Sequence, residues 1–280
     1  MPYSYVTLTR ALASAGIEEA RHEAALLLEH FAGASRGTLL LDRDRVYDVP
    51  PLEEAVRRRL EREPLQYILG TWEFFGLPFT VSPHCLVPRA DTECLVEEAI
   101  RRLPQGGRFA DLCTGSGCIA VATLARRPDL SGVALELYPD TLALAMKNAA
   151  DNGVAERFIP LQADLLAGGE DALAGLAPLD GILSNPPYIP TRAIEALSPE
   201  VKREPRVALD GGEDGLVFYR AILRDYVKLT RPGGLILFEI GCDQGEALRR
   251  LCAEYVPEAT VAVLQDLAGL DRVVRITLPR

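Results

Sequence analysis

The fold of this chain is decided by the stretch Phe109-Ala110-Asp111-Leu112-Cys113-Thr114-Gly115-Ser116-Gly117-Cys118-Ile119-Ala120. Its apolar first half predicts a strand over Arg108–Cys113, and its second half predicts the start of a helix. Gly115 and Gly117 let the backbone turn tightly and approach a ligand without a Cβ clash. A strand, a glycine loop and a helix in this order are typical of an open α/β sheet, which binds ligands at the carboxyl ends of its strands.

From about residue 90 onward, short apolar runs alternate with helical patterns, as in a parallel sheet with helices on both faces. The predicted strands are Arg108–Cys113, Val133–Leu137, Phe158–Gln162, Gly181–Ser184, Leu235–Ile240, Val261–Gln265 and Val273–Thr277. Only Asp266 to Arg272 join the last two, which is too short for a helical crossover. We therefore expect these two strands to form an antiparallel hairpin at the sheet edge.

The first part of the chain has a different pattern. Apolar residues follow the helical period up to Pro64, whose ring cannot continue a helix. β-Prone residues then surround the turn signal Gly76-Leu77-Pro78. We expect a helical domain over residues 1–70, a β-hairpin linker over residues 71–88 and the sheet domain over residues 89–280. The basic run Arg57-Arg58-Arg59 is either a solvated helix face or a docking patch for a partner.

Composition excludes several classes of protein. Acidic residues outnumber basic ones 40 to 30, and a net charge of -10 disfavours a protein that grips a long phosphate backbone. No apolar stretch approaches the roughly 20 residues that span a bilayer, and no secretory signal precedes the first helix. The six cysteines form no C-x-x-C pair, so we expect reduced thiols, no metal site and a cytoplasmic location.

Polar side chains at three successive strand ends indicate an adenosine ligand. The loop Cys113, Thr114, Gly115, Ser116 and Gly117 lacks the third glycine of a dinucleotide fingerprint, which disfavours a pyrophosphate. Glu136 ends the next strand, where a carboxylate can accept both hydroxyls of a ribose. Asp164 ends the third strand and could accept from an adenine amino group while Leu165 packs on the ring. This combination predicts S-adenosylmethionine as the ligand.

The run Asn185-Pro186-Pro187-Tyr188 follows the fourth strand and predicts the acceptor site. The prolines stiffen the backbone, so the Asn185 side chain and the Pro186 carbonyl become two fixed acceptors for a planar –NH2 group. Tyr188 can stack on that plane. Holding both hydrogens favours a pyramidal nitrogen and stabilises the positive charge that develops as a methyl group arrives.

With these motifs the sequence resembles the HemK family of protein-(glutamine-N5) methyltransferases that act on class 1 peptide chain release factors. Beyond the glycine loop and the Asn-Pro-Pro-Tyr run, the resemblance rests on Glu63 to Gly70, Trp72 to Phe74, Val87 to Glu93, Glu204-Pro205 with Ala208 to Gly212, and Asp266 to Arg272. It implies a Rossmann-like seven-stranded methyltransferase sheet of order 3-2-1-4-5-7-6.

The resemblance also implies roles for individual residues. Residues from Cys113 to Gly117, with Glu136, Leu165 and Asn185, would contact S-adenosylmethionine. Asn185, Pro186, Pro187 and Tyr188 would hold the substrate glutamine, and the N-terminal helices would engage the release factor. For the family residues Arg89, Thr92 and Glu93 we expect only a structural role.

Three positions depart from the family pattern. Cys113 replaces a more usual glycine, which the loop tolerates if φ is negative there. Glu136 replaces the commoner aspartate, so the ribose contact needs a slightly retracted backbone. Tyr138 replaces a small capping residue and leaves Pro139 at the first helical position without a side-chain cap.

The acceptor motif alone does not distinguish a glutamine from a nucleobase. The alternatives are an adenine-N6 or cytosine-N4 DNA methyltransferase, a glutamine methyltransferase of a ribosomal protein, and a module that binds S-adenosylmethionine without catalysis. The negative charge and the lack of a basic recognition domain disfavour DNA. We therefore expect methylation of the glutamine in the Gly-Gly-Gln motif of class 1 release factors. The oligomeric state is not predicted.

Overall fold

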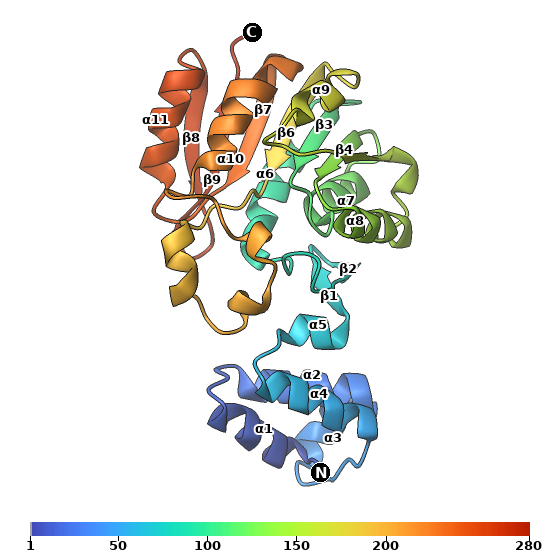
Figure 1. The fold of residues 1–280 in the computed structure, drawn as a ribbon. Helices are drawn as coiled ribbons and strands as arrows, with labels where there is room; N and C mark the ends of the chain where they lie inside the picture. Colours follow the sequence, from blue (N-terminus) through green and yellow to red (C-terminus); the bar gives the residue numbers. More distant parts are fainter. Residues whose placement is uncertain (1) are drawn as a thin grey trace. The chain divides into compact units, whose positions relative to one another are not determined.

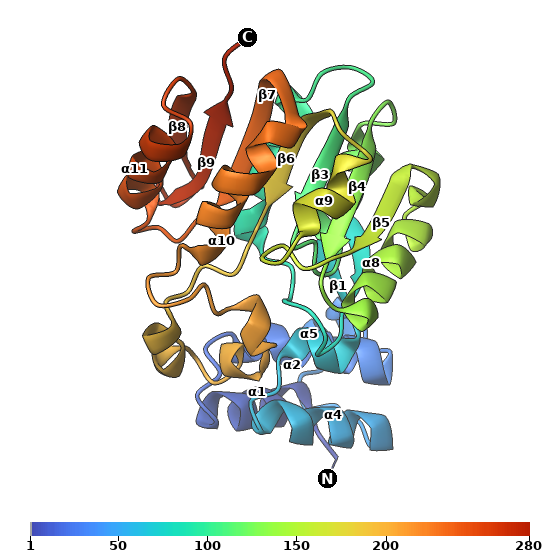
Figure 2. The same cartoon turned by 45° about the horizontal axis from the view of Figure 1, so that its top comes forward.

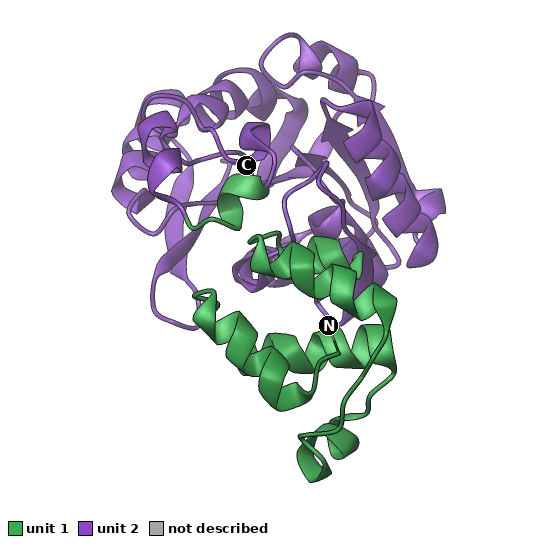
Figure 3. Cartoon of the chain, turned by 60° about the horizontal axis from the view of Figure 1, so that its bottom comes forward, with its two compact units in different colours: residues 1–71, 198–203 green, residues 72–197, 204–280 purple. Residues whose placement is uncertain are grey.

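The structure, a computed structural model, describes residues 2–280 and divides the chain into two compact units. The first unit comprises the residues up to Thr71 together with Ser198–Arg203, and the second comprises Trp72–Leu197 and Glu204–Arg280 (Figure 3). In residues 2–280 no helix is both long and apolar enough to cross a membrane.

The first unit is helical, as its sequence predicts (Figure 1). Its helices are α1 (Tyr5–Ser14), α2 (Ala20–Ala32), α3 (Arg36–Leu41), α4 (Pro50–Leu60) and α5 (Leu65–Leu69). Ser4 caps α1 by accepting the Thr7 N–H, which satisfies one of the amides that the first turn leaves open. Leu8, Leu12 and Leu27 are fully buried in a core shared by these helices.

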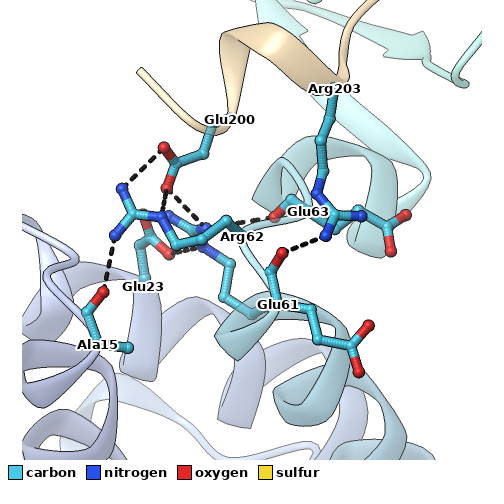
Figure 4. Close-up of polar contacts among 8 residues, drawn as sticks. Ala15, Glu23, Glu61, Arg62, Glu63, Glu200 and Arg203 are labelled. Carbon is cyan, nitrogen blue, oxygen red and sulfur yellow. Dashed lines mark hydrogen bonds and ion pairs between the residues drawn. The ribbon is translucent and has the colours of Figure 1, made fainter.

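A short segment from far along the chain completes this unit. Ser198–Arg203, which includes the 3-10 turn Val201–Arg203, is held by ion pairs (Figure 4). Glu200 accepts from Arg59 at 2.9 Å and from Arg62 at 2.8 Å, and Arg203 donates to the Glu61 carbonyl. Arg59 is 4% exposed, so this part of the basic run is neither a solvated face nor an open docking patch.

The hairpin β1 (Thr71–Phe74) and β2 (Leu77–Thr80) forms as predicted. Residues 71–88 were expected to form a separate linker, whereas the hairpin packs into the second unit from Trp72 onward. Phe74 and Phe79 are buried in that unit's core and meet edge to face with ring centroids 5.9 Å apart. The hairpin is therefore part of the sheet unit.

The second unit contains the predicted seven-stranded sheet in the order β5-β4-β3-β6-β7-β9-β8. Numbered within the sheet, this order is 3-2-1-4-5-7-6, as the resemblance implied. The strands are β3 (Arg108–Leu112), β4 (Ser131–Glu136), β5 (Phe158–Gln162), β6 (Leu179–Ser184), β7 (Thr230–Glu239), β8 (Thr260–Gln265) and β9 (Asp271–Thr277). The first five are parallel, and β8 and β9 form the predicted antiparallel hairpin at the edge.

Successive strand residues face opposite sides, so the sheet builds two cores. Phe109 belongs to the core shared with α6 (Glu93–Arg102), α7 (Cys118–Arg126) and α8 (Pro139–Asp151). Ala110 belongs to the core shared with α9 (Gly169–Ala174), α10 (Val217–Ala221) and α11 (Gly245–Tyr255), and α9 and α10 lie over this face in Figure 2. Short turns complete the unit: the 3-10 turns Ala90–Thr92, Ala155–Arg157, Thr191–Ala196, Arg206–Ala208 and Val227–Leu229, and the π-helical turn Ile222–Tyr226.

Candidate active site

A cavity of about 300 Å³ opens at the carboxyl ends of the parallel strands, within the second unit. This volume falls at the lower end of the range for small-molecule sites. The strand ends and the loops that follow them supply Cys113, Thr114, Gly115, Ser116, Leu135, Glu136, Ala163, Asp164, Leu165, Asn185 and Pro187. The structure thus brings most of the predicted donor site together with the start of the predicted acceptor motif.

Three of the predicted site residues do not line this cavity: Gly117, Pro186 and Tyr188. Gly117 has a packing role, because a Cβ there would lie 3.1 Å from the Ala145 Cβ of α8. Gly115 differs, since no described residue other than its chain neighbours has an atom within 4 Å of the place of its Cβ, and its φ is 57°. Gly115 therefore leaves the cavity side of the loop open for a ligand, while Gly117 lets α8 pack closely.

The condition under which the loop would tolerate Cys113, a negative φ, is not met. Its φ is 62°, in the left-handed region that costs a side chain about 1–2 kcal/mol. Tyr138 is as predicted: α8 begins without a side-chain cap and with Pro139 in its first turn. The glycine loop thus carries local strain at Cys113 next to the cavity.

Asp111 fixes the inner side of the glycine loop. Its carboxylate accepts the Thr114 hydroxyl at 2.6 Å and the Ala120 N–H at 3.2 Å. Burial raises the pKa of Asp111 to about 7, and these hydrogen bonds oppose the rise. The carboxylate ties the loop to the first turn of α7.

Glu136 is a buried acceptor, 8% exposed, and not a surface glutamate. Its Oε1 accepts the N–H groups of Leu137 and Tyr138 at 3.0 and 3.2 Å, and its Oε2 accepts the Gly115 N–H at 3.0 Å. Burial raises the pKa of Glu136, and the same N–H groups lower it. A carboxylate has about four acceptor sites, so capacity remains for a ribose hydroxyl.

The third strand end supplies the remaining donor-site side chains. Asp164 accepts the Leu166 N–H through Oδ1 at 2.8 Å, which sets the turn after β5. Leu165 is 4% exposed and adds an apolar wall to the cavity. These features fit S-adenosylmethionine. The glycine loop leaves an open approach for the ligand, the buried carboxylate fits the ribose, and the apolar wall beside an acceptor fits the adenine.

The acceptor motif extends from the end of β6. Asn185 donates through Nδ2 to the Thr92 hydroxyl oxygen at 3.3 Å. The carbonyl of Tyr188 accepts the side-chain amide of Gln244 at 3.0 Å. Asn185 and Pro187 line the cavity, so the motif begins at the donor site itself.

Sequence reasoning missed one wall of the cavity, which is formed by residues 84–89, Thr92, Val207, Ala208, Asp210 and Phe218. Arg89 pairs with the buried carboxylate of Glu204, which also accepts the Val87 N–H at 2.9 Å. Glu93 accepts the Phe75 N–H at 2.8 Å. These contacts give Arg89 and Glu93 structural roles, as expected. The sequence indicated this wall only through the family motifs that begin at Val87 and at Glu204. Their spacing in the sequence did not predict that the two motifs contact each other.

Comparisons with known proteins agree with this architecture. The PrmC N-terminal domain family matches residues 6–70, and the methyltransferase small domain family matches residues 90–220. A solved methyltransferase structure from Pyrococcus furiosus is 15% identical, with a TM-score of 0.53, and covers 74% of this chain and 91% of that chain. This likeness supports the methyltransferase fold.

Similar full-length sequences identify the family. A release factor glutamine methyltransferase of Geobacter sulfurreducens is 43% identical over 267 residues, which cover 94% of this chain and 91% of that protein. Another from Moorella thermoacetica is 41% identical over 270 residues, covering 94% and 93%. Because both relatives match almost the whole chain and the fold is that of a methyltransferase, this protein is an enzyme of the release factor glutamine methyltransferase family.

Proposed function

We propose that this enzyme transfers a methyl group from S-adenosylmethionine to the side-chain amide nitrogen of the glutamine in the Gly-Gly-Gln motif of class 1 peptide chain release factors. The observation that carries the proposal is that one cavity is lined both by Asn185 of the acceptor motif and by Gly115 and Glu136 of the donor site. An amide held by Asn185 would lie beside the donor, and such proximity lowers the barrier to transfer.

The donor site is proposed to be formed by Cys113, Thr114, Gly115, Ser116, Glu136, Asp164, Leu165 and Asn185. When bound, S-adenosylmethionine supplies a methyl group on a positively charged sulfur and leaves as S-adenosylhomocysteine. Glu136 would accept a ribose hydroxyl, and Asp164 would accept the adenine amino group. Leu165 would pack against the base.

The acceptor residues would activate a poor nucleophile. Asn185 Oδ1 and the Pro186 carbonyl would each accept one N–H of the glutamine amide, and Tyr188 would cover its plane. The glutamine nitrogen held by these acceptors would receive the methyl group that S-adenosylmethionine supplies, and it would then lose one proton to water. Charge that develops on nitrogen is stabilised by the two oxygens, so no strong base is required before transfer.

The choice of substrate rests on charge and on the relatives. A chain with a net charge of -10 is poorly suited to a nucleic-acid substrate and can meet a basic translation factor favourably. Glycines beside the target would let a loop enter a narrow site without side-chain clashes. The related proteins are named for release factors, and we propose that the N-terminal helices engage that partner. We propose a cytoplasmic location for the enzyme. We propose neither a nucleic acid nor a membrane as a partner.

The test is incubation with labelled methyl donor and purified release factor, followed by mass spectrometry of the modified residue. Plasmid DNA and ribosomal protein serve as parallel substrates, and the Asn185→Ala variant serves as the inactive control. We expect label on the glutamine of the Gly-Gly-Gln motif. Label on adenine or cytosine, or a release factor that stays unmodified at that glutamine, would overturn the proposal.

A further inference from the structure

A polar network lies behind the acceptor motif; Thr92, at its near end, lines the cavity, whereas Glu239 does not. Glu239, the last residue of β7, is 2% exposed, and Thr92, in the 3-10 turn before α6, is 1% exposed. The Thr92 side chain acts on the Glu239 carboxyl group as a hydrogen-bond donor that lowers its pKa, although Glu239 Oε2 has no partner at full hydrogen-bond geometry among residues 2–280. Glu239 also accepts the Tyr188 hydroxyl through Oε1 at 3.4 Å. Both ends of the acceptor motif are thus tied to one buried carboxyl group.

The network sets which way the Asn185 amide points. A threonine hydroxyl has one proton, and a carboxylate can only accept, so Thr92 gives its proton to Glu239. The oxygen of Thr92 can then only accept, and its partner must be the NH2 group of Asn185, at 3.3 Å. A flipped amide would place the Asn185 oxygen against the Thr92 lone pairs. The two orientations of the Asn185 amide differ little in shape, so its hydrogen-bonding partners determine which orientation is present.

We infer that Thr92 and Glu239 are positioning residues for methyl transfer, because they turn the Asn185 oxygen toward the amide that accepts the methyl group and hold the Tyr188 ring. The inference rests on the proposed function, in which Asn185 must accept an N–H. A flipped Asn185 would present its NH2 group to the substrate NH2 group, and the grip on the nitrogen would be lost.

The surroundings of Glu239 agree with this role. Burial raises the pKa of Glu239 to about 7, and the hydrogen bond from Thr92 opposes that rise. Arg272 of β9 also lowers this pKa, whereas Asp91 raises it. The Tyr219 hydroxyl donates to the Glu239 carbonyl at 2.6 Å, which fixes the end of β7. A carboxyl group so far from solvent needs hydrogen-bonding partners, and one of them, Tyr188, belongs to the acceptor motif.

The experiment is a double-mutant cycle on single-turnover methylation of release factor, at about pH 8.5, where Glu239 is ionised. We expect Thr92→Val to lower the transfer rate by roughly 10- to 100-fold, less than full loss of a transition-state partner. Donor affinity should stay within about twofold, and Thr92→Ser should restore most of the rate. In the Asn185→Ala background, Thr92→Val should change the rate by less than about twofold, because its effect passes through Asn185.

Glu239→Gln provides a second, isosteric variant, and we expect it to lower the rate with donor affinity preserved. If wild type modifies the glutamine but Thr92→Val and Glu239→Gln transfer at the wild-type rate, the inference is wrong and the proposed function stands. Full additivity of Thr92→Val with Asn185→Ala would also overturn it. If wild type itself leaves the glutamine unmodified, the proposed function has failed.

Discussion

Glu136→Gln isolates the ribose contact from the architecture of the loop. The substitution keeps the size of the side chain but replaces one acceptor oxygen by an NH2 group. In the structure the two oxygens accept three backbone N–H groups at 3.0 to 3.2 Å. Glutamine has a single oxygen, so it cannot serve these amides and a ribose hydroxyl together.

The expected loss of affinity follows from the strength of hydrogen bonds to charged groups, about 1.5–3 kcal/mol. At about 1.4 kcal/mol for each factor of ten, S-adenosylhomocysteine should bind roughly 10- to 100-fold more weakly to the variant. Isothermal titration calorimetry at a pH above neutrality measures this loss, because burial raises the pKa of Glu136 and the wild type must be ionised.

A matched control separates this loss from a general effect. Glu156 is exposed and does not line the cavity, so Glu156→Gln should leave affinity unchanged. Urea unfolding of the ligand-free variant reports how much the loop itself depends on Glu136. An unchanged dissociation constant for Glu136→Gln would remove Glu136 from the donor site and refute the reasoning.

Four further outcomes are expected. Asn185→Ala should lower the single-turnover rate about 10²–10³-fold with the fold intact; a near-normal rate would contradict its role. The pKa of Asp111 is raised from 3.8 to about 7 in the folded protein, so folding takes up protons at pH values between these two. As pH rises through this window, the wild type should therefore lose stability relative to Asp111→Asn, by at most about 4 kcal/mol. Urea unfolding at pH values below and above the window measures this loss. Cys113→Val should lower the free energy of unfolding by more than about 1 kcal/mol, whereas Cys113→Gly should stay within about 1 kcal/mol of wild type; equal effects would argue against strain at φ 62°. A chain that begins at Trp72 should retain donor binding and lose efficient methylation of intact release factor, and an unchanged specificity constant would give the N-terminal helices another purpose.

The sequence predicted the sheet well because apolar runs between turn and helix signals are local. All seven predicted strands form, and β5 (Phe158–Gln162) has the predicted bounds. The segment Ser198–Arg203 was not predictable, because its ion pairs join residues 138 to 141 positions apart and leave no periodic pattern. The φ of Cys113 could not be predicted from the cysteine itself, and the available signal was the glycine that is more usual at this position in the family that the sequence resembles.

The candidate site was predictable where a residue type and a strand end coincide, as at Glu136 and Asp164. Glu239 carried a weaker signal that was not used: it is a glutamate inside the apolar run Leu235–Ile240, and a charge in a buried strand calls for a partner. The identity of that partner was not readable, because Thr92 lies 147 positions earlier.

The four residues of the acceptor motif therefore do not make an acceptor site by themselves. The prolines after Asn185 restrict the backbone, but they leave the orientation of its amide open. That orientation depends on Thr92, which comes from the 3-10 turn before α6, and on Glu239, which comes from the end of β7. The same carboxyl group receives the Tyr188 hydroxyl. Inserting Asn-Pro-Pro-Tyr into another sheet would reproduce the stiff loop, whereas the aligned oxygen requires the buried pair behind it.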